Sequence, residues 1–236
     1  MLYQEVKRKL IADIVSGAVP PGGALPNESE LARRFEVSIG TIRRAVEELV
    51  ADHVLLRQQG RGTFVGRLDR ERFMFQFFKI AGRDGKRDFP KVRLHSFTKS
   101  RATPEEAKGL GMATAGAVFR IDNVLSLQGR AVIHDHIVVD AHLFAGLTKQ
   151  SFSQRTGTIY ELYQTGFGVT VVGADERLRA ELVSPVSAEL LELAAGTPVL
   201  RIERVARTFD HKPAEFRVSV VDSRDFDYVS PMREPR

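Results

Sequence analysis

The chain of 236 residues contains no cysteine and no tryptophan. Without cysteine it can form no disulfide framework, no thiolate metal site and no thiol nucleophile. No apolar run approaches the roughly 20 residues needed to cross a bilayer. The N-terminal segment also lacks the apolar core of a secretion signal. These absences favour a cytoplasmic protein that has no membrane partner.

Length and charge leave room for two domains and for a polyanionic partner. The chain is longer than one compact domain usually requires, and its 43% hydrophobic content is ordinary for a globular protein. A formal net charge of +5 and a pI of about 9.6 suit nucleic acid. An excess of this size does not decide the matter, so the position of the charges matters more than their sum.

Three short helices are predicted within residues 1–66. Apolar residues recur at three- and four-residue steps over 2–15 and indicate an amphipathic helix that ends before a pair of prolines. A second helix should begin after Asn27, because Asn27 and Glu30 have the spacing of a capping box. A third should begin after Ser38. Its polar face carries Gly40, Thr41, Arg43, Arg44 and Glu47.

A glycine-rich hairpin is predicted directly after the third helix. Residues 54–56 and 63–65 are the expected strands, and the turn between them carries arginines and glycines. Glycine allows close approach of the backbone to a ligand, and arginine offers bidentate contacts to phosphates or bases.

Two helices joined by a tight turn can place the second helix in the major groove, and a following basic hairpin can contact the minor groove. Taken singly, the helix also fits a solvated surface and the hairpin a soluble turn. The candidate DNA-binding residues are Asn27, Ser38, Gly40, Thr41, Arg43, Arg44, Arg57, Arg61, Gly62 and Thr63.

This region resembles the DNA-binding domain of the GntR family of bacterial regulators along its whole length. The resemblance rests on three ordered segments: Gly17…Pro21-Gly22…Leu25-Pro26, Leu31-Ala32…Phe35…Val37-Ser38…Thr41…Arg43, and Gln59-Gly60-Arg61-Gly62-Thr63-Phe64-Val65. It implies a winged helix-turn-helix with Thr41, Arg43 and Arg44 on the recognition helix. Ser29 and Ile39 stand where the family usually has arginine, and Glu36 stands where it has glycine. The missing arginines imply an operator unlike the family's usual one.

Residues 67–72 are charged and are predicted to form a linker to a second domain at 73–236. Phe73, Phe75 and Phe77 recur at period two, which predicts a strand with one buried face. The polar, glycine-containing stretch 82–90 predicts a loop.

The second domain contains an internal duplication. Residues 103–124 align with residues 184–205 at a constant offset of 81. Each copy predicts a helix with a Thr-Pro or Ser-Pro start, a turn, a strand, and a second strand after another turn. We therefore predict an α+β domain with one antiparallel sheet. The arrangement resembles the effector-binding UTRA domain of the HutC subfamily, whose fold is shared with chorismate lyase, and implies a small-molecule effector.

Two registers place different residues of the first copy in a ligand pocket. The offset of 81 aligns His134 with Glu215, His136 with Arg217, and Val138 with Ser219. Polar residues at matched positions on apolar strands mark either a pocket or the solvent face. The family resemblance implies Asp135 instead, which points to the opposite face, and the sequence does not choose between the two.

The resemblance also implies that Thr158 and Tyr160 lie at the pocket. Asn123 and Leu125 occupy the positions of an arginine pair that holds phosphate in sugar-phosphate-sensing relatives, so that mode of binding is not expected. The candidate effector-binding residues are His134, Asp135, His136, Thr158, Tyr160, Glu215, Arg217 and Ser219.

These features predict a repressor that binds an inverted-repeat operator as a homodimer and is released by a small molecule. Dimer contacts are expected from the C-terminal sheet and the phenylalanine-rich segment. Two alternatives stay open: an enzyme of chorismate-lyase-like fold with an accessory DNA-binding head, and a DNA-architectural protein without a ligand. The chain has no nucleophile elbow, P-loop or dinucleotide fingerprint. His134 and His136 lack further ligands at suitable spacing, so we expect no metal and no cofactor.

Overall fold

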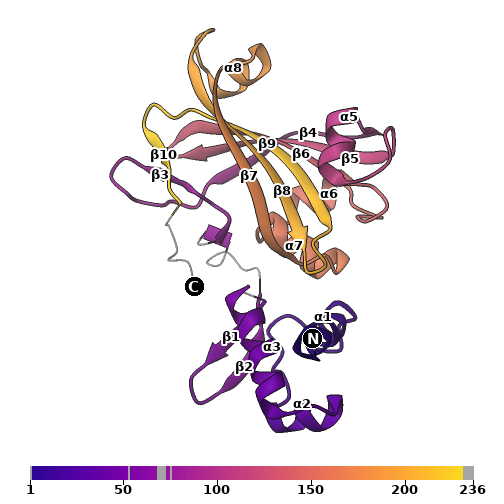
Figure 1. The fold of residues 1–236 in the computed structure, drawn as a ribbon. Coiled ribbons are helices and arrows are strands. Elements are labelled where there is room, and N and C mark those ends of the chain that lie inside the picture. The colour runs from indigo at the N-terminus through magenta and orange to yellow at the C-terminus, as the bar shows by residue number, and fades with distance from the viewer. Residues whose placement is uncertain (1, 53, 68–72, 75, 231–236) are drawn as a thin grey trace.

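The computed structural model describes residues 2–52, 54–67, 73–74 and 76–230. A small helical head with a hairpin comes first along the chain, and a larger sheet domain follows (Figure 1). The predicted linker 67–72 lies outside the described residues except for Arg67. Within the ranges given, no helix is long and apolar enough to cross a membrane.

The head has the predicted three helices and hairpin: α1 (Leu2–Val15), α2 (Glu28–Phe35), α3 (Ile39–Ala51), β1 (Leu55–Gln58) and β2 (Gly62–Val65). Asn27 caps α2, since its side chain accepts from the Glu30 amide and the Glu30 carboxylate accepts from the Asn27 amide. The Ser38 hydroxyl caps α3 by accepting from the Thr41 amide. Both predicted helix starts are confirmed.

The apolar stripes of the three helices meet in one core. Its buried members are Val6, Leu10, Ile14, Leu31, Ile42, Ala45, Val46, Leu49, Val54, Leu55, Val65 and Phe209. Each large aliphatic side chain buried in this way contributes about 1.5–3 kcal/mol. Phe209 belongs to the second domain, so the core of the head is completed from outside the head.

The second domain is built on one antiparallel sheet of six strands, in the order β4-β5-β6-β9-β8-β7. The strands are β4 (Lys91–Arg101), β5 (Ala117–Leu127), β6 (Arg130–Asp140), β7 (Val171–Leu182), β8 (Pro198–Thr208) and β9 (Pro213–Val221). A separate pair joins β3 (Ile80–Gly82) to β10 (Phe226–Tyr228). The predicted α+β class with one main antiparallel sheet is confirmed.

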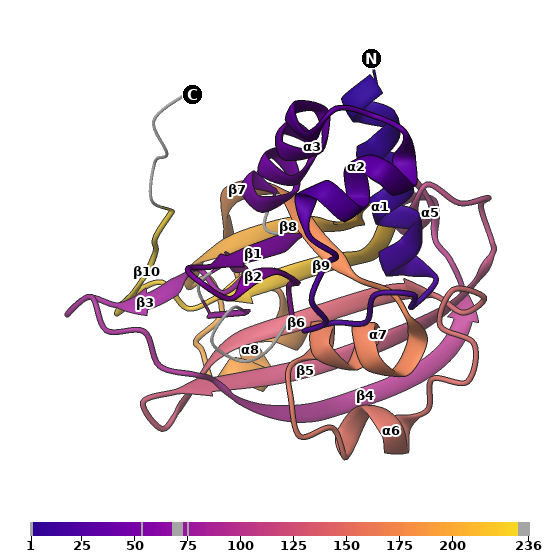
Figure 2. The same ribbon diagram turned by 90° about the horizontal axis from the view of Figure 1, so that it is seen from below.

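Helices cover both faces of this sheet (Figures 1 and 2). On one face lie α5 (Pro104–Leu110), packed against Val138 and Phe216, and α8 (Pro185–Leu191), packed against Val124 and Val220. On the other face lie α6 (Lys149–Ser153) and α7 (Ile159–Phe167), in the largest apolar cluster.

The duplication is visible in the backbone. The helices α5 and α8 and the strands β5 and β8 begin 81 residues apart, and Thr103 and Ser184 cap the two helices. Two left-handed positions are also shared, with glycine in one copy only. Gly111 (φ 61°) corresponds to Glu192 (φ 56°), and Ala115 (φ 64°) corresponds to Gly196 (φ 79°).

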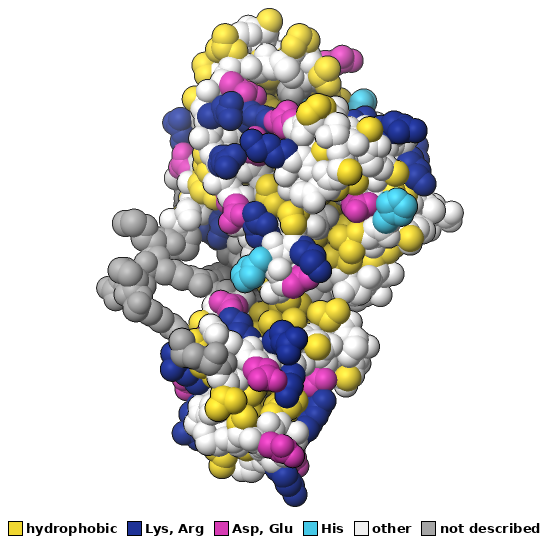
Figure 3. All heavy atoms as spheres, turned by 45° about the vertical axis from the view of Figure 1, so that its right-hand side comes forward, with side chains coloured by type: hydrophobic (Ala, Val, Ile, Leu, Met, Phe, Trp, Pro, Cys, Tyr) yellow, Lys and Arg dark blue, Asp and Glu magenta, His cyan; other side chains and the backbone are white. Residues whose placement is uncertain are grey.

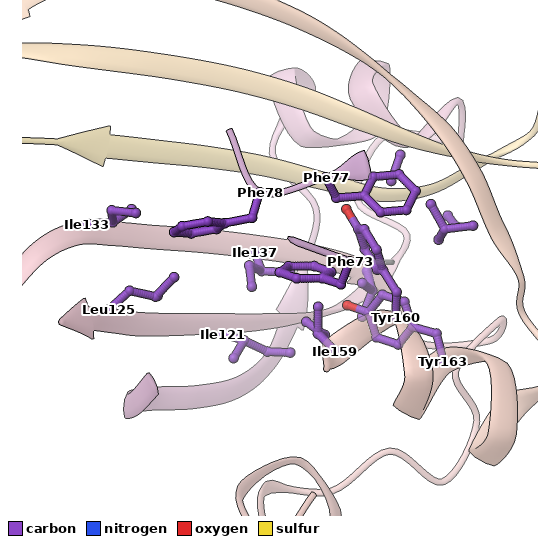
Figure 4. Close-up of a cluster of buried hydrophobic side chains, with 14 of the residues drawn as sticks. Phe73, Phe77, Phe78, Ile121, Leu125, Ile133, Ile137, Ile159, Tyr160 and Tyr163 are labelled. Carbon is purple, nitrogen blue, oxygen red and sulfur yellow. The ribbon is translucent and has the colours of Figure 1, made fainter. Parts of the chain in front are cut away.

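The predicted strand through Phe73 and Phe77 is wrong. Residues 73, 74 and 76 are helical, and the Phe77 amide donates to the Phe73 carbonyl at 2.8 Å. Phe73 and Phe77 are four residues apart, so the same apolar spacing also fits one face of a helix. Both rings and Phe78 are buried on the α7 face of the sheet (Figure 4). Phe75 lies outside the described residues.

Candidate nucleic-acid interface and effector pocket

Three elements of the head are joined by one carboxylate. Glu28, the first residue of α2, accepts from Arg43 of α3 at 2.9 Å and from Arg57 of β1 at 3.5 Å. The arginine side chains remain 57% and 46% exposed, so a phosphate can reach both. Glu47 also lies 4.0 Å from Arg57, so the two guanidinium groups are balanced by two carboxylates and are held at the surface by exposed ion pairs. Exposed pairs of this kind are weak, so both arginines can exchange them for phosphates.

The other basic candidates lie on aromatic rings. The Arg44 guanidinium lies 4.2 Å from the centre of the Tyr3 ring, and that of Arg61 lies 5.9 Å from the centre of Phe64. These contacts restrain long side chains while leaving their donors available. Figure 3 shows lysine and arginine side chains on the head, in the lower part of the view.

The uncharged candidates have mainly conformational roles. Asn27 and Ser38 cap helices, and the Thr41 hydroxyl lies 2.9 Å from that of Ser38. Thr63 faces Arg57 across the hairpin. A Cβ on Gly62 would meet no atom within 4 Å, but its φ of +114° strains any other residue there. Gly40 is exposed in the first turn of α3.

A buried ionic cluster lies on the α7 face of the sheet. The Arg217 guanidinium donates to Glu215 at 2.9 and 3.0 Å and to Asp135 at 3.0 Å. The Ser219 hydroxyl donates to Asp135, and the hydroxyls of Tyr160 and Tyr163 donate to Glu215 at 3.1 and 2.8 Å.

Charges as deeply buried as these persist only when paired, because desolvation disfavours each ion alone. Burial together with the Glu215 carboxylate raises the pKa of Tyr160, which stays a neutral donor. The carboxylates outweigh the burial of Arg217 and raise its pKa, so it stays charged.

The structure places Asp135, not His134 or His136, on the face of this cluster. Asp135 pairs directly with Ser219 across β6 and β9, and such partners project to the same side. His134 lies on the opposite face, with Nδ1 3.0 Å from the Ser187 hydroxyl of α8. His136 lies on that face too, with Nδ1 2.7 Å from Asp122.

One additional residue in the second hairpin explains the difference. Asn123 pairs with Asp135 in the first copy, and Arg204 pairs with Arg217 in the second. Asn123 and Arg204 are 81 residues apart, but Asp135 and Arg217 are 82 apart. A shift of one residue exchanges the two faces of a strand. The alignment at 81 therefore matched residues that point in opposite directions.

The histidine face carries its own polar network. Asp122 contacts His136 and the Ser96 hydroxyl, and Glu106 binds Arg120 at 2.6 Å. The Asp122 carboxylate raises the pKa of His136. In the part of the chain that the structure describes, no group of three or more His, Asp or Glu side chains could hold a metal ion.

Two small cavities flank Phe73 beside the ionic cluster. The first, of about 50 Å³, is lined by Phe89, Pro90, Asn123, Arg155 and Thr158 among others. The second, of about 40 Å³, is lined by Phe77, Phe78, Arg204, Ser219 and Tyr228 among others. Phe73, Leu125, Asp135 and Arg217 border both.

Tyr160 and Glu215 are fully buried and border neither cavity. Both belong to the ionic cluster of Arg217, which borders both cavities. Phe73 packs edge-on against Tyr160 with ring centres 5.6 Å apart (Figure 4). Sequence reasoning missed Arg155, Arg204 and the position of Phe73. An isolated arginine carries no periodic signal that distinguishes a cavity wall from the surface.

Comparison with known proteins agrees with this architecture. Residues 2–65 match the family model "Bacterial regulatory proteins, gntR family", and residues 86–227 match the UTRA domain. The histidine utilization repressor of Pseudomonas putida is 32% identical over 204 residues, which cover 86% of this chain and 81% of that protein. The chain belongs to the GntR family. Within it, the UTRA domain and this relative confirm the predicted resemblance to the HutC subfamily.

Two solved structures have the same fold. The ligand-binding domain of a GntR-family regulator from Bordetella bronchiseptica has a TM-score of 0.63 and 27% identity, and the match covers 67% of this chain and 98% of that one. YydK from Bacillus subtilis has a TM-score of 0.60 over 98% of this chain and all of its own, and its 20% identity supports the fold alone. This GntR protein is thus a transcriptional regulator with an effector-binding domain, and not an enzyme.

Proposed function

We propose that this GntR protein represses nearby metabolic genes as a homodimer on an inverted-repeat operator in the cytoplasm, where that DNA lies. A small molecule bound beside Arg217 releases it. The observation that carries the proposal is the position of Phe73, which borders both cavities and directly follows the predicted linker to the DNA-binding head. A ligand larger than either cavity has to move this ring.

On DNA, the N-terminal turns of α3 enter the major groove, and Arg61 and Gly62 at the hairpin tip approach the minor groove. Arg43 and Arg57 leave Glu28 for phosphate or base edges. One two-fold dimer presents two such heads, and the six-stranded sheet with the phenylalanine-rich segment supplies the dimer contacts.

Two contacts connect the pocket to the head. Phe209, in the turn between β8 and β9, is buried in the core of the head, and Gln164 of α7 donates to the Gly66 carbonyl at 3.4 Å. The views in Figures 1 and 2 agree that the head lies by this end of the sheet. Arg217 and Glu215 lie on the same strand that begins at this turn. Ligand binding therefore favours one placement of the DNA-binding head over another. The size of this effect equals the difference between the ligand's binding free energies for the two placements.

Operator binding is tested with a duplex selected from random sequence by the full-length protein. Arg43→Ala should weaken binding to that duplex by about 1–3 kcal/mol, the usual value for a lost base contact. Arg83→Ala changes an exposed arginine in the turn after β3, outside the six-stranded sheet; it is the matched control and should bind as the wild type does. Equal affinity of the wild type and Arg43→Ala would contradict the docking of α3.

Effector response is tested by adding fractions of a cell extract to the operator complex. A fraction should lower the affinity for the duplex, and its active metabolite should be recovered chemically unchanged. Failure of every fraction to alter DNA binding would remove the ligand-responsive part of the proposal.

A further inference from the structure

Arg155 is a cation at the wall of the first cavity, and within the described residues it makes no direct ion pair with a carboxylate. Its Nη1 donates to the Phe152 carbonyl, and its guanidinium packs 4.1 Å from the centre of the Phe152 ring. Its Nε is buried and has no hydrogen-bond partner. Burial lowers the pKa of this guanidinium, with the nearby Arg217 acting in the same direction. A charge held in this way is costly unless an anion joins it.

The neighbouring cations are in a different situation. Arg204 binds Glu176 at 2.6 Å, and Arg217 binds both Asp135 and Glu215. Among these three arginines of the α7 face, Arg155 therefore differs in having a guanidinium donor, Nε, without a hydrogen-bond partner in the described part of the chain.

A second unsatisfied polar atom lies in the same cavity wall. Asn123 is 2% exposed, and its Oδ1 has no hydrogen-bond partner. The oxygen and nitrogen of an amide exchange places by a half-turn, so this side chain can also offer a donor. Two unsatisfied groups around one cavity indicate a missing polar ligand, since buried polar atoms in proteins are normally paired.

The charges around the cavity select the type of anion. Arg217 is already outweighed by Asp135 and Glu215, which leaves one net negative charge, and Arg155 alone offsets it. A carboxylate matches the guanidinium fork with a single negative charge. A phosphate dianion would bring twice that charge beside two carboxylates and only one available cation.

We propose that Arg155, with Asn123, binds the carboxylate of the effector, so that this regulator responds to a small carboxylic acid. The inference rests on the proposed function for its biological meaning. The cavity of about 50 Å³ holds a carboxylate group, because one water molecule accounts for about 30 Å³ of liquid volume. The rest of the ligand lies against Phe73 and Phe89, which line the same cavity.

The test uses the full-length protein without DNA and three probes at constant ionic strength: acetate, acetamide and inorganic phosphate. Acetate and acetamide have nearly the same shape and differ in charge. The Nε–H resonance of Arg155 in ¹⁵N-labelled protein reports binding directly, and the melting temperature reports stabilisation. Acetate should shift both in a saturable way, whereas acetamide and phosphate should have little effect.

The variant Arg155→Gln should bind acetate about tenfold or more weakly, since a charge-assisted pair is lost. The matched control is Arg130→Gln, which alters a half-exposed arginine paired with Asp225 and should retain the acetate response.

The inference is overturned if acetamide or phosphate binds as well as acetate, if acetate has no effect, or if Arg155→Gln retains the full response. These results are independent of the operator assay. In one outcome, the same extract fraction at the same concentration releases both the wild type and Arg155→Gln from the operator duplex. That result would keep the regulatory function and reject the role of Arg155. Absence of any active fraction would reject the regulatory function and leave the acetate result to decide on Arg155.

Discussion

Ala115→Gly should stabilise the effector domain, and Gly196→Ala should destabilise it by a similar amount. The two residues occupy the same position in the two copies of the duplication, with φ values of 64° and 79°. Both are exposed, and a Cβ on Gly196 would meet no atom within 4 Å. Side-chain packing therefore does not distinguish the two positions. The left-handed backbone alone decides whether a substitution raises or lowers the free energy of unfolding.

The magnitude follows from two opposing terms. A left-handed conformation costs a residue with a Cβ about 1–2 kcal/mol. Glycine adds freedom to the unfolded chain, which costs about 0.4–1 kcal/mol of stability. The difference favours glycine by about 1 kcal/mol, which shifts the melting temperature of a domain of this size by about 2–4 °C. At the second shared position, Glu192→Gly should stabilise the domain and Gly111→Ala should destabilise it, since Glu192 and Gly111 have φ values of 56° and 61°.

Unfolding is followed by near-ultraviolet circular dichroism of tyrosine. The chain has no tryptophan, and three of its four tyrosines, Tyr160, Tyr163 and Tyr228, lie in the second domain. Gly173→Ala is the matched control, because Gly173 has neither a positive φ nor a neighbour within 4 Å of an added Cβ. It should not destabilise the domain. Equal effects of Gly173→Ala and Gly196→Ala would refute the role of the left-handed backbone.

Three further outcomes are expected. Glu36→Gly should stabilise the head by up to about 1 kcal/mol in urea unfolding, since Glu36 ends α2 with a φ of 56°; a loss of stability would contradict this reading. Glu215→Ala should lower the free energy of unfolding by about 3–5 kcal/mol, because Arg217 loses a buried partner; Glu215→Gln should cost less, and equal losses would mean that cavity formation dominates. Finally, the bond from Arg120 helps to hold the pKa of Glu106 at about 2, below its usual 4.5. The lowered pKa stabilises the fold above about pH 4.5, and this stability is lost as pH falls from 4.5 towards 2. Urea midpoints measured against pH should show a shallower acid loss in Arg120→Met than in the wild type.

Local signals in the sequence were sufficient for the head and for the outline of the second domain. Caps such as Asn27 and Ser38 act through bonds to residues three positions away, so they can be read without the fold. The duplicated helices and strands likewise carry their periodicity within short windows. These features predicted the helix-turn-helix, the hairpin and the repeated units.

The pocket depended on contacts between distant segments. Asp135 meets Arg217 across 82 residues, and one additional hairpin residue decides which face of β9 it meets. Phe73 and Phe77 lie on one face of a helical turn and pack against Tyr160, far along the chain, although period two alone suggested a strand. The cavity beside Arg155 is formed by segments distant in sequence, such as those of Phe73 and Arg217. Local bonds specify elements, whereas the register and burial that assemble a site come from tertiary packing.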